Sequence, residues 1–239
     1  MKAIILAAGI ASRLRPLTDH CPKCLLEINN KSILERTIES LKINNIKDIT
    51  IVTGYLNHMI EEFIKSRFNN LNITFIKNEA YDSTNNIYSL WLALKNVEDE
   101  VILLDSDIIY DPKLIKILIN SKEEDVLLSN NHTLGEEEIK IIVNNENKIT
   151  EISKVCDISK AIGESIGIER MSKTYIKNLK LELDKMIVKE NLINVFYELA
   201  FERLIDKGYL FSYIDTSKYF SMELDTVEDF NEASNTIKE

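Results

Sequence analysis

The chain has 239 residues, and its 29 lysines and arginines against 39 aspartates and glutamates give a formal net charge of −10. Nucleic-acid binding depends on a basic face that releases counterions, so this balance argues against a nucleic-acid partner. Hydrophobic residues make up 45% of the chain, which excludes a disordered protein and allows a packed core. Apolar runs fall far short of the roughly 18 residues that cross a bilayer. No secretory signal follows Met1, so we expect a cytoplasmic protein without a membrane partner.

The cysteines fit the same expectation. Cys21, Cys24 and Cys156 are odd in number and too few for a disulfide scaffold. Cys21 and Cys24 have the CxxC spacing of a redox pair or half a zinc site, but no second CxxC follows. We interpret them as small residues packed beside a functional lysine.

The first half of the chain alternates between strand and helix patterns. Continuous apolar runs predict strands buried on both faces, and apolar residues at helical spacing predict helices between them. Ser32 begins the first helix with a capping-box pattern, and Asp111-Pro112 begins the last. The predicted strands lie at residues 3–7, 48–53, 72–76, 101–104 and 125–129, and the predicted helices at 32–44, 57–68, 85–95 and 111–119.

The second half has a different pattern. It predicts a hairpin of strands 138–143 and 148–153, a strand at 163–169, helices at 172–186 and 192–206, a strand at 211–214 and a helix after Asp225. We therefore expect an α/β fold, with a doubly wound, mostly parallel sheet and an inserted antiparallel α+β lid. No linker is visible, so we expect a single domain over residues 1–239 with two lobes, 1–129 and 130–239.

The loop after the first strand, from Leu6 to Pro16, reads LAAGIASRLRP. Small residues let the backbone approach a ligand closely, and their N–H groups can form an anion-binding concavity. The first 23 residues carry four basic residues and one acidic residue, although the whole chain is acidic. This local charge favours a phosphate ligand, and the alternative is a solvated loop with ordinary surface charges.

Leu6 to Pro16, followed by Pro22-Lys23, resembles the LAAGxGxRLxP…PK signature of the nucleotidyltransferase family, which joins NTPs to phosphorylated small molecules. The resemblance runs from residue 2 to 233 and implies the family's Rossmann-like sheet. It implies that Arg13 holds the β- and γ-phosphates and that Lys23 holds the α-phosphate side or the acceptor phosphate. The nucleotide would also contact Leu6, Ala8, Gly9, Ile10, Ala11 and Ser12. Ala11 stands where the family usually has glycine, so we expect a slightly stiffer loop.

Carboxylates follow a buried strand in Asp105-Ser106-Asp107 and recur near the C-terminus in Glu223-Leu224-Asp225. Hard carboxylate oxygens suit Mg²⁺. The resemblance implies that Asp107 and Asp225 hold this metal and that Asp105 lies at the nucleotide. The alternative for Asp225 is helix capping, although Thr226 with Asp229 could cap equally well.

Two further segments carry residues of the expected site. The segment 83–91 resembles one in the phosphocholine cytidylyltransferase branch, where Asn85, Asn86 and Ser89 would read a pyrimidine base. Such residues are equally ordinary helix caps or core residues. Lys154 ends the hairpin at the place where related enzymes have a lysine that neutralises the acceptor phosphate, and Lys160 is its competitor.

The resemblance implies Mg²⁺-dependent transfer of a cytidylyl group from CTP to a small phosphate or phosphonate monoester, with release of pyrophosphate. Lobe 1–129 would bind the nucleotide, and lobe 130–239 would bind the acceptor and supply the C-terminal metal segment. Residues 125–174 contain no Phe, Tyr or Trp and cannot build a cage for a quaternary ammonium, whereas residues 136–138 could hold a primary ammonium. Both 2-aminoethylphosphonate and phosphocholine stay candidate acceptors, because a cage could still come from aromatic residues elsewhere in the chain: Tyr81, Tyr88, Trp91, Tyr197 or Tyr219. The alternatives are a sugar-1-phosphate nucleotidylyltransferase and a catalytically silent nucleotide-sensing domain.

Overall fold

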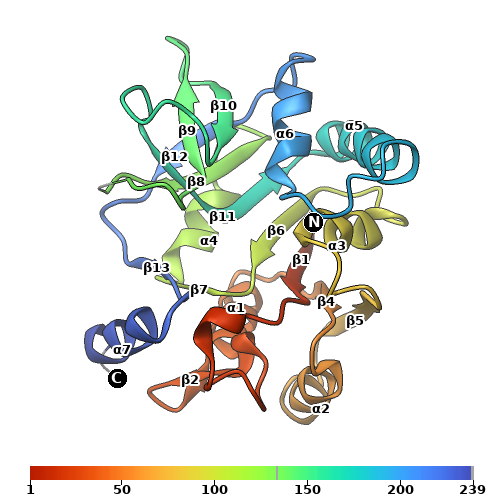
Figure 1. Ribbon diagram of the computed structural model, residues 1–239, viewed down its shortest axis with the longest axis vertical. Coiled ribbons are helices and arrows are strands. Elements are labelled where there is room, and N and C mark those ends of the chain that lie inside the picture. Colours follow the sequence, from red (N-terminus) through yellow and green to blue (C-terminus); the bar gives the residue numbers. More distant parts are fainter. Residues whose placement is uncertain (133, 238–239) are drawn as a thin grey trace.

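A computed structural model describes residues 1–132 and 134–237 of the chain. Its centre is a nine-stranded sheet in the order β10-β9-β11-β6-β1-β4-β5, with β8 paired to β11 and β12 paired to β8 (Figure 1). Four neighbouring strands run parallel: β1 (Lys2–Ala7), β4 (Asp48–Thr53), β5 (Asn72–Lys77) and β6 (Val101–Asp105). The prediction of an α/β fold with a mostly parallel central sheet is therefore confirmed.

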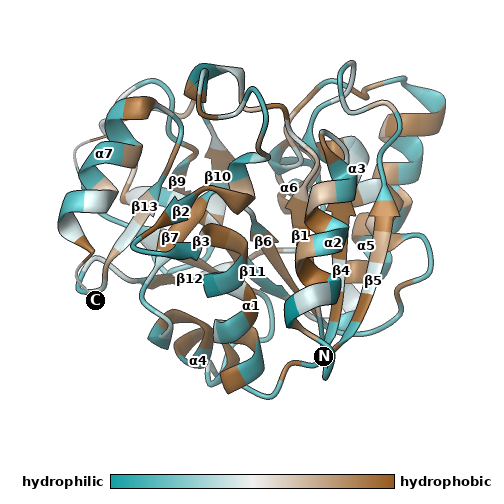
Figure 2. Ribbon diagram, turned by 90° about the horizontal axis from the view of Figure 1, so that it is seen from below, coloured by the Kyte–Doolittle hydropathy of each residue, from teal (hydrophilic) through white to brown (hydrophobic). Residues whose placement is uncertain are grey.

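Helices cover both faces of this sheet. Alternate side chains of β1 point to opposite faces, and each set packs in a separate hydrophobic core with its own helices. Ala3, Ile5 and Ala7 pack with α1 (Ile33–Ile43), α2 (Asn57–Arg67) and α4 (Lys113–Ile119). Ile4 and Leu6 pack with α3 (Asn86–Leu94), α5 (Lys173–Asp184) and α6 (Glu198–Ile205). Figure 2 shows the brown apolar strands enclosed between helices whose outer faces are largely teal. The sheet is thus doubly wound, and β1 lies inside it between β6 and β4.

The second half of the chain extends the same sheet with antiparallel strands. β11 (Gly163–Met171) pairs antiparallel with β6 and β8 (Val126–Asn130), and the predicted hairpin forms as β9 (Lys140–Val143) and β10 (Ile149–Ser153). β12 (Ser212–Asp215) runs parallel to β8. The strands of the expected lid are therefore continuous with the parallel strands, and the division into two lobes at residue 129 stays a prediction.

Small elements that the sequence analysis missed carry the C-terminal segment back to the centre. β7 (Ile108–Tyr110) pairs antiparallel with β13 (Ser221–Glu223), and α7 (Val227–Thr236) follows. The short strands β2 (Glu27–Ile28) and β3 (Lys31–Ser32) form a separate pair. The blue C-terminal ribbon consequently lies beside β7 in Figure 1.

The predicted helix at 192–206 begins later than expected, at Glu198. The residues before it are held by the start of α3: the Ile193 carbonyl accepts from the Asn85 N–H at 3.0 Å, and the Tyr197 N–H donates to the Asn86 side chain at 2.8 Å. These tertiary bonds replace the helical bonds that the apolar spacing suggested. In the same region, a π-helical turn at Lys185–Lys189 follows α5.

Among the described residues, no helix combines the length and the apolar character that a membrane span requires. Cys21, Cys24 and Cys156 are free thiols, and Cys24 is buried next to Lys23, in keeping with the packing role expected for it. Burial raises the pKa of Cys24, so this thiol stays neutral.

Candidate active site

A cavity of about 1140 Å³ opens where β1 and β6 end. Its wall is built by the loop after β1, the start of α3, the loop before β9, and the segments around β11 and β13. Every site residue expected from the sequence lies on this wall: Leu6, Ala8, Gly9, Ile10, Ala11, Ser12, Arg13, Lys23, Asn85, Asn86, Ser89, Asp105, Asp107, Lys154 and Asp225. Lys160 lies elsewhere on the surface, where it pairs with Asp157 at 3.3 Å. The roles of the wall residues stay predictions.

The loop after β1 turns sharply at Ala11, which has φ 52° and ψ 52°. Its carbonyl accepts bonds from the Leu14 N–H at 3.1 Å and the Thr18 hydroxyl at 2.9 Å. This left-handed conformation costs a residue with a Cβ about 1–2 kcal/mol, which explains why a glycine suits this position. The bonds to Leu14 and Thr18 fix the turn in spite of that cost.

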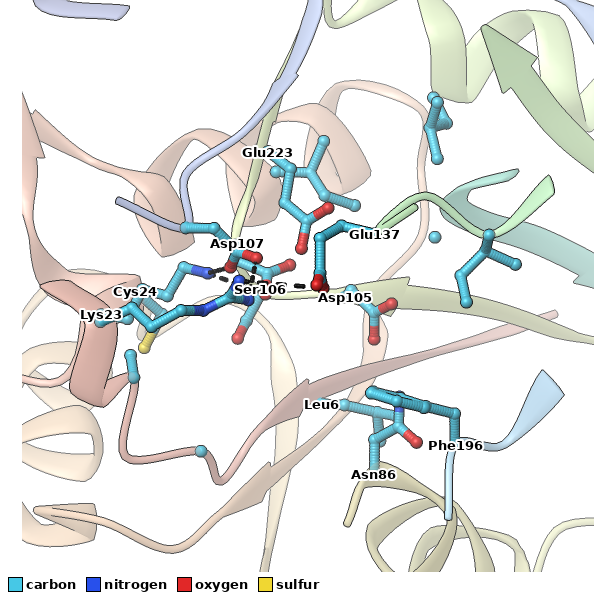
Figure 3. A pocket seen from close by; sticks show the side chains of 18 of the residues that line it. Leu6, Lys23, Cys24, Asn86, Asp105, Ser106, Asp107, Glu137, Phe196 and Glu223 are labelled. Atoms are coloured by element: carbon cyan, nitrogen blue, oxygen red, sulfur yellow. Dashed lines mark hydrogen bonds and ion pairs between the residues drawn. The ribbon is translucent and has the colours of Figure 1, made fainter. Parts of the chain in front are cut away.

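The ammonium of Lys23 connects the two predicted metal carboxylates. Its Nζ lies 3.1 Å from Asp107 Oδ2 and 2.7 Å from Asp225 Oδ1 (Figure 3). Burial alone would lower the pKa of Lys23, but the charges of Asp107 and Asp225 outweigh it and raise that pKa. Arg13 also bonds to Asp225. The motif residues therefore form one linked group of charges.

Asp107, Glu223 and Asp225 each offer a carboxylate oxygen within 4.8 Å of the others. Burial, reinforced by the charges of Asp107 and Asp225, raises the pKa of Glu223 to about 8. Three oxygen donors of this kind match the chemistry of a hard divalent cation, so this group could hold a metal. The sequence analysis noted Glu223 only as a neighbour of Asp225, although the ExD spacing was the signal for it.

Asp225 is not needed to cap α7. The Thr226 hydroxyl accepts from the Asp229 N–H at 3.2 Å, while the Asp229 carboxylate accepts from the Thr226 N–H at 2.7 Å. This reciprocal capping box satisfies the start of the helix. The carboxylate of Asp225 is thus available to Lys23, Arg13 or a metal.

The polar residues at the start of α3 all make structural hydrogen bonds. Asn85 Oδ1 caps α3 by accepting from the Asn86 N–H at 2.8 Å, and Ser89 Oγ accepts from Asn78 Nδ2 at 3.2 Å. Asn78 is buried, lies on the cavity wall and was missed by the sequence analysis. The helix-cap interpretation of Asn85 therefore holds, and the residue also faces the cavity.

The acidic loop beside the hairpin differs from expectation. Glu137 Oε2 lies 3.1 Å from Lys154 Nζ and 4.0 Å from Arg13 Nη1, so it already pairs with two cations. Glu138 Oε2 accepts from the Gly135 N–H at 2.7 Å. Buried Lys140 anchors the loop through the carbonyls of Gly135 at 2.9 Å and Glu138 at 3.2 Å. Glu137 and Glu138 thus face partners within the chain and are poorly placed to hold an ammonium.

The cavity floor carries a second acidic group. Asp105 Oδ2 accepts from the Tyr197 hydroxyl at 3.0 Å, and burial, with the nearby charge of Asp107, raises the pKa of Asp105 well above its usual range. Glu198 also lies on the wall and is 6% exposed. Sequence reasoning missed Glu198 and considered Tyr197 only as a ring of a possible cage, because the bonds between residues 193–197 and α3 that bring them to the site leave no local signal.

Comparison with known proteins shows what the chain is similar to. A sequence profile of the family described as Nucleotidyl transferase matches residues 2–152. The chain is 41% identical over 131 residues to CTP:phosphoglutamine cytidylyltransferase of Campylobacter jejuni, a stretch covering 52% of this chain and 50% of that protein. It is 39% identical over 107 residues to choline-phosphate cytidylyltransferase of Streptococcus pneumoniae, covering 45% and 44%. The match spans about half the length of these curated relatives.

Solved structures share the whole fold. The CTP:phosphocholine cytidylyltransferase from Streptococcus pneumoniae superposes with a TM-score of 0.83 over 99% of both chains, at 24% identity. The inositol-1-phosphate CTP transferase from T. maritima superposes with a TM-score of 0.80 over 100% of this chain and 96% of that one, at 21% identity. At these identities the likeness establishes the fold alone.

Replacing Gly167 tests how Asp105 is held. Gly167 has φ +66°, and a Cβ there would meet Asp105 Oδ2 at 2.6 Å. We expect Gly167→Ala to lower the free energy of unfolding by about 2–4 kcal/mol, from backbone strain plus the collision. Gly208 is the matched control, with φ +87° and no atom within 4 Å of an added Cβ. Gly208→Ala should show the strain alone, and equal losses in urea titrations would contradict the close packing against Asp105.

Replacing Lys23 tests the charge group. Lys23→Met leaves the carboxylates uncompensated, so we expect a loss of about 2 kcal/mol or more in unfolding free energy at pH 7. Lys31, in an exposed pair with Glu39, is the control, and Lys31→Met should cost about 1 kcal/mol at most.

The same comparison has a pH signature. Burial acts to raise the pKa of Asp225, but Lys23 outweighs it and holds that pKa below 3.8. A lowered carboxyl pKa stabilises the fold above its unfolded value, and this stabilisation is lost as the pH falls through the folded value. The difference in unfolding free energy between Lys23→Met and the unmodified chain should therefore become smaller below about pH 4. A difference that does not depend on pH would argue against the ion pairs.

Proposed function

The chain belongs to the nucleotidyl transferase family, and from that premise we propose that it transfers the cytidylyl group of CTP to a small phosphate or phosphonate monoester and releases pyrophosphate. The observation that carries the proposal is the meeting of Arg13, Lys23, Asp107 and Asp225 at the mouth of one cavity. Two relatives support the proposal, because they are described as cytidylyltransferases for choline phosphate and phosphoglutamine. A relative of Streptomyces rubellomurinus, 28% identical over 123 residues, is described as a CMP-5'-(3-aminopropyl)phosphonate synthase.

Asp107 and Asp225 would hold Mg²⁺, with Glu223 beside them, because the three carboxylates match its preferred oxygen donors. When bound, Mg²⁺ supplies positive charge that stabilises the phosphates during transfer. The chain itself places Lys23 between the same two carboxylates. That position puts the lysine beside the proposed metal ligands, where its charge would neutralise an α-phosphate bound to the metal.

Arg13 and the backbone of residues 8–12 would bind the triphosphate. The planar guanidinium suits two phosphate oxygens, and N–H groups of a tight loop suit a third. Leu6, Asn85, Asn86, Ser89 and Asp105 would surround the nucleoside.

Lys154 would neutralise the acceptor phosphate across the cavity. With both substrates fixed in line, positioning and charge neutralisation carry the reaction without a covalent enzyme intermediate.

The alternative acceptors remain within the family. A relative of Campylobacter jejuni, 32% identical over 124 residues, is described as a D-glycero-alpha-D-manno-heptose 1-phosphate guanylyltransferase, which keeps a sugar-1-phosphate acceptor as the second candidate. A silent nucleotide sensor would not need the second metal carboxylate, so the pairing of Asp107 with Asp225 disfavours it.

Pyrophosphate release tests the proposal. The purified chain should release pyrophosphate with CTP and Mg²⁺, faster than with UTP, GTP or dTTP, when given phosphocholine, 2-aminoethylphosphonate, phosphoethanolamine or phosphoglutamine. Asp107→Asn and Asp225→Asn should each lower kcat at least a hundredfold, about 3 kcal/mol of transition-state stabilisation. Asp157→Asn, a carboxylate paired with Lys160 outside the cavity, should keep full activity. Release with sugar 1-phosphates alone would favour the second candidate, and no release with any NTP would favour the sensor.

The division of work between the cations is a separate prediction. Arg13→Ala should raise the KM for CTP at least tenfold, and Lys154→Ala should raise the KM for the acceptor by a similar factor, because each removes charge opposite one substrate, about 1.4 kcal/mol. Lys160→Ala serves as the control, since Lys160 pairs with Asp157 away from the cavity. Titration of each substrate at saturating levels of the other measures both constants. If Arg13→Ala and Lys154→Ala affect both constants alike, the division is wrong.

A further inference from the structure

Glu198 is a buried carboxylate that the reaction outlined above does not use. It begins α6, lines the cavity and is 6% exposed. Its Oε2 is buried and has no hydrogen-bond partner within residues 1–132 and 134–237. A buried carboxylate with an unpartnered oxygen is costly in free energy, whereas a cation bound from the cavity would compensate its charge.

The surroundings of Glu198 are also acidic. Glu169 also has a buried Oε2 without a hydrogen-bond partner among the described residues, and the charge of Glu198 acts on both Glu169 and Asp105. Burial raises the pKa of Glu198 to about 7, while the positive charge of Lys154 opposes that rise. Lys154 itself is committed to Glu137 at 3.1 Å. This part of the cavity therefore gathers buried carboxyl groups whose ionised forms a bound cation would stabilise.

The aromatic side chains decide which cation would fit. Among the described wall residues, Phe, Tyr and Trp are represented by Tyr81 and Phe196. The Phe196 ring faces Lys154, whose Nζ is 4.8 Å from the ring centroid, and Phe196 lies beside Asn86 in Figure 3. The other candidates are engaged elsewhere: Tyr88 packs on Trp91 with 5.3 Å between ring centroids, and Tyr197 packs on Phe201 in the core. A quaternary ammonium, which has no N–H to donate, depends on a cage of several rings that this wall lacks.

We propose that Glu198 is the specificity-determining residue that binds an unmethylated ammonium group on the acceptor. The acceptor would then be a small zwitterion, with its phosphate or phosphonate at Lys154 and its ammonium at Glu198. This inference rests on the proposed function, because it assigns the second end of the same acceptor.

The layout of the cavity matches such a molecule. The Nζ of Lys154 lies 4.8 Å from the centroid of the Phe196 ring, and Glu198 follows Phe196 by two residues. The charge of Lys154 acts on Glu198, so this part of the wall offers a cation and a carboxyl group near each other. A primary ammonium carries a positive charge and donates up to three hydrogen bonds, so it can compensate a carboxylate on the cavity wall. A trimethylammonium cannot donate any, and a neutral hydroxyl lacks the charge.

Three matched phosphonates test the inference: 2-aminoethyl-, 2-hydroxyethyl- and 2-(trimethylammonio)ethylphosphonate. We expect the unmodified chain to prefer the aminoethyl compound over each of the others at least tenfold, both in kcat/KM with CTP and in Kd by calorimetry. Glu198→Gln keeps the shape and removes the charge, so it should reduce the preference over the hydroxyethyl compound at least tenfold while changing kcat/KM for the hydroxyethyl compound less than threefold. Glu202→Gln, on the same helix but outside the cavity wall, should leave the preference unchanged.

Several outcomes overturn the inference. A preference for the trimethylated compound places the cation against aromatic rings instead, and an equal loss for all three compounds in Glu198→Gln assigns the residue a structural role. If Glu198→Gln does not fold, Glu198→Asp takes its place and should weaken aminoethyl binding selectively. Failure of the proposed function is distinguishable, since pyrophosphate would then be released with none of the three, and calorimetry would still decide whether the ammonium is bound through Glu198.

Discussion

The ammonium group of Lys23 bonds to two carboxylates that are far apart in the sequence, Asp107 in the middle of the chain and Asp225 near its C-terminus, and the geometry of the site depends on these bonds. Asp107 follows the central strand β6, whereas Asp225 lies 202 residues after Lys23. Backbone bonds carry the C-terminal segment there, since β13 pairs with β7 and the Leu224 N–H donates to the Asp107 carbonyl at 2.9 Å. Carboxylate oxygens of Asp107 and Asp225 lie within 4.8 Å of each other. Two negative charges this close repel strongly in a partly buried site, so the carboxylates need a cation between them. Lys23 supplies that cation within the chain, and a metal would add to it.

Charge is distributed unevenly around the cavity. Arg13, Lys23 and Lys154 face the side where the phosphates are proposed to bind, and Glu137 bridges Arg13 and Lys154 from an exposed loop, where its side chain is 76% exposed. Buried Lys140 donates hydrogen bonds to the backbone carbonyls of Gly135 and Glu138 in that loop. These bonds fix the backbone on either side of Glu137. Glu198 lies on the same wall, and Lys154, whose charge acts on it, is paired with Glu137. A wall that carries both cations and an unpartnered carboxylate oxygen complements a substrate that has an anionic and a cationic group.

The sequence predicted elements well where the spacing of apolar residues along the chain decides which side chains are buried. The strands at 3–7 and 48–53 and the helix at 57–68 were predicted well because their apolar spacing reports burial directly. β7 and β13 are three residues each, too short for any periodicity, and they exist because they pair with each other. The late start of α6 depends on bonds between Asn86 and Tyr197, which lie 111 residues apart and leave no local signal.

The candidate site divides in the same way. The N-terminal signature and the DxD and ExD segments indicated Arg13, Lys23, Asp107 and Asp225, because motif spacing is visible in one dimension. Glu198 could not be singled out among 39 acidic residues from the sequence. It differs from most of them in being buried with an Oε2 that has no hydrogen-bond partner among the described residues, which only the structure shows. The three consecutive glutamates at 136–138 suggested an ammonium site because they concentrate negative charge. In the structure Glu137 and Glu138 lie on the cavity wall, and both are paired within the chain.

A crystal structure with a non-hydrolysable CTP analogue and Mn²⁺, read by anomalous diffraction, tests the central claim most directly. The account predicts a manganese peak bound by Asp107 and Asp225, with the α-phosphate of the analogue beside Lys23 and the terminal phosphates on Arg13. A manganese peak away from these two carboxylates, or a nucleotide bound outside this cavity, would contradict it.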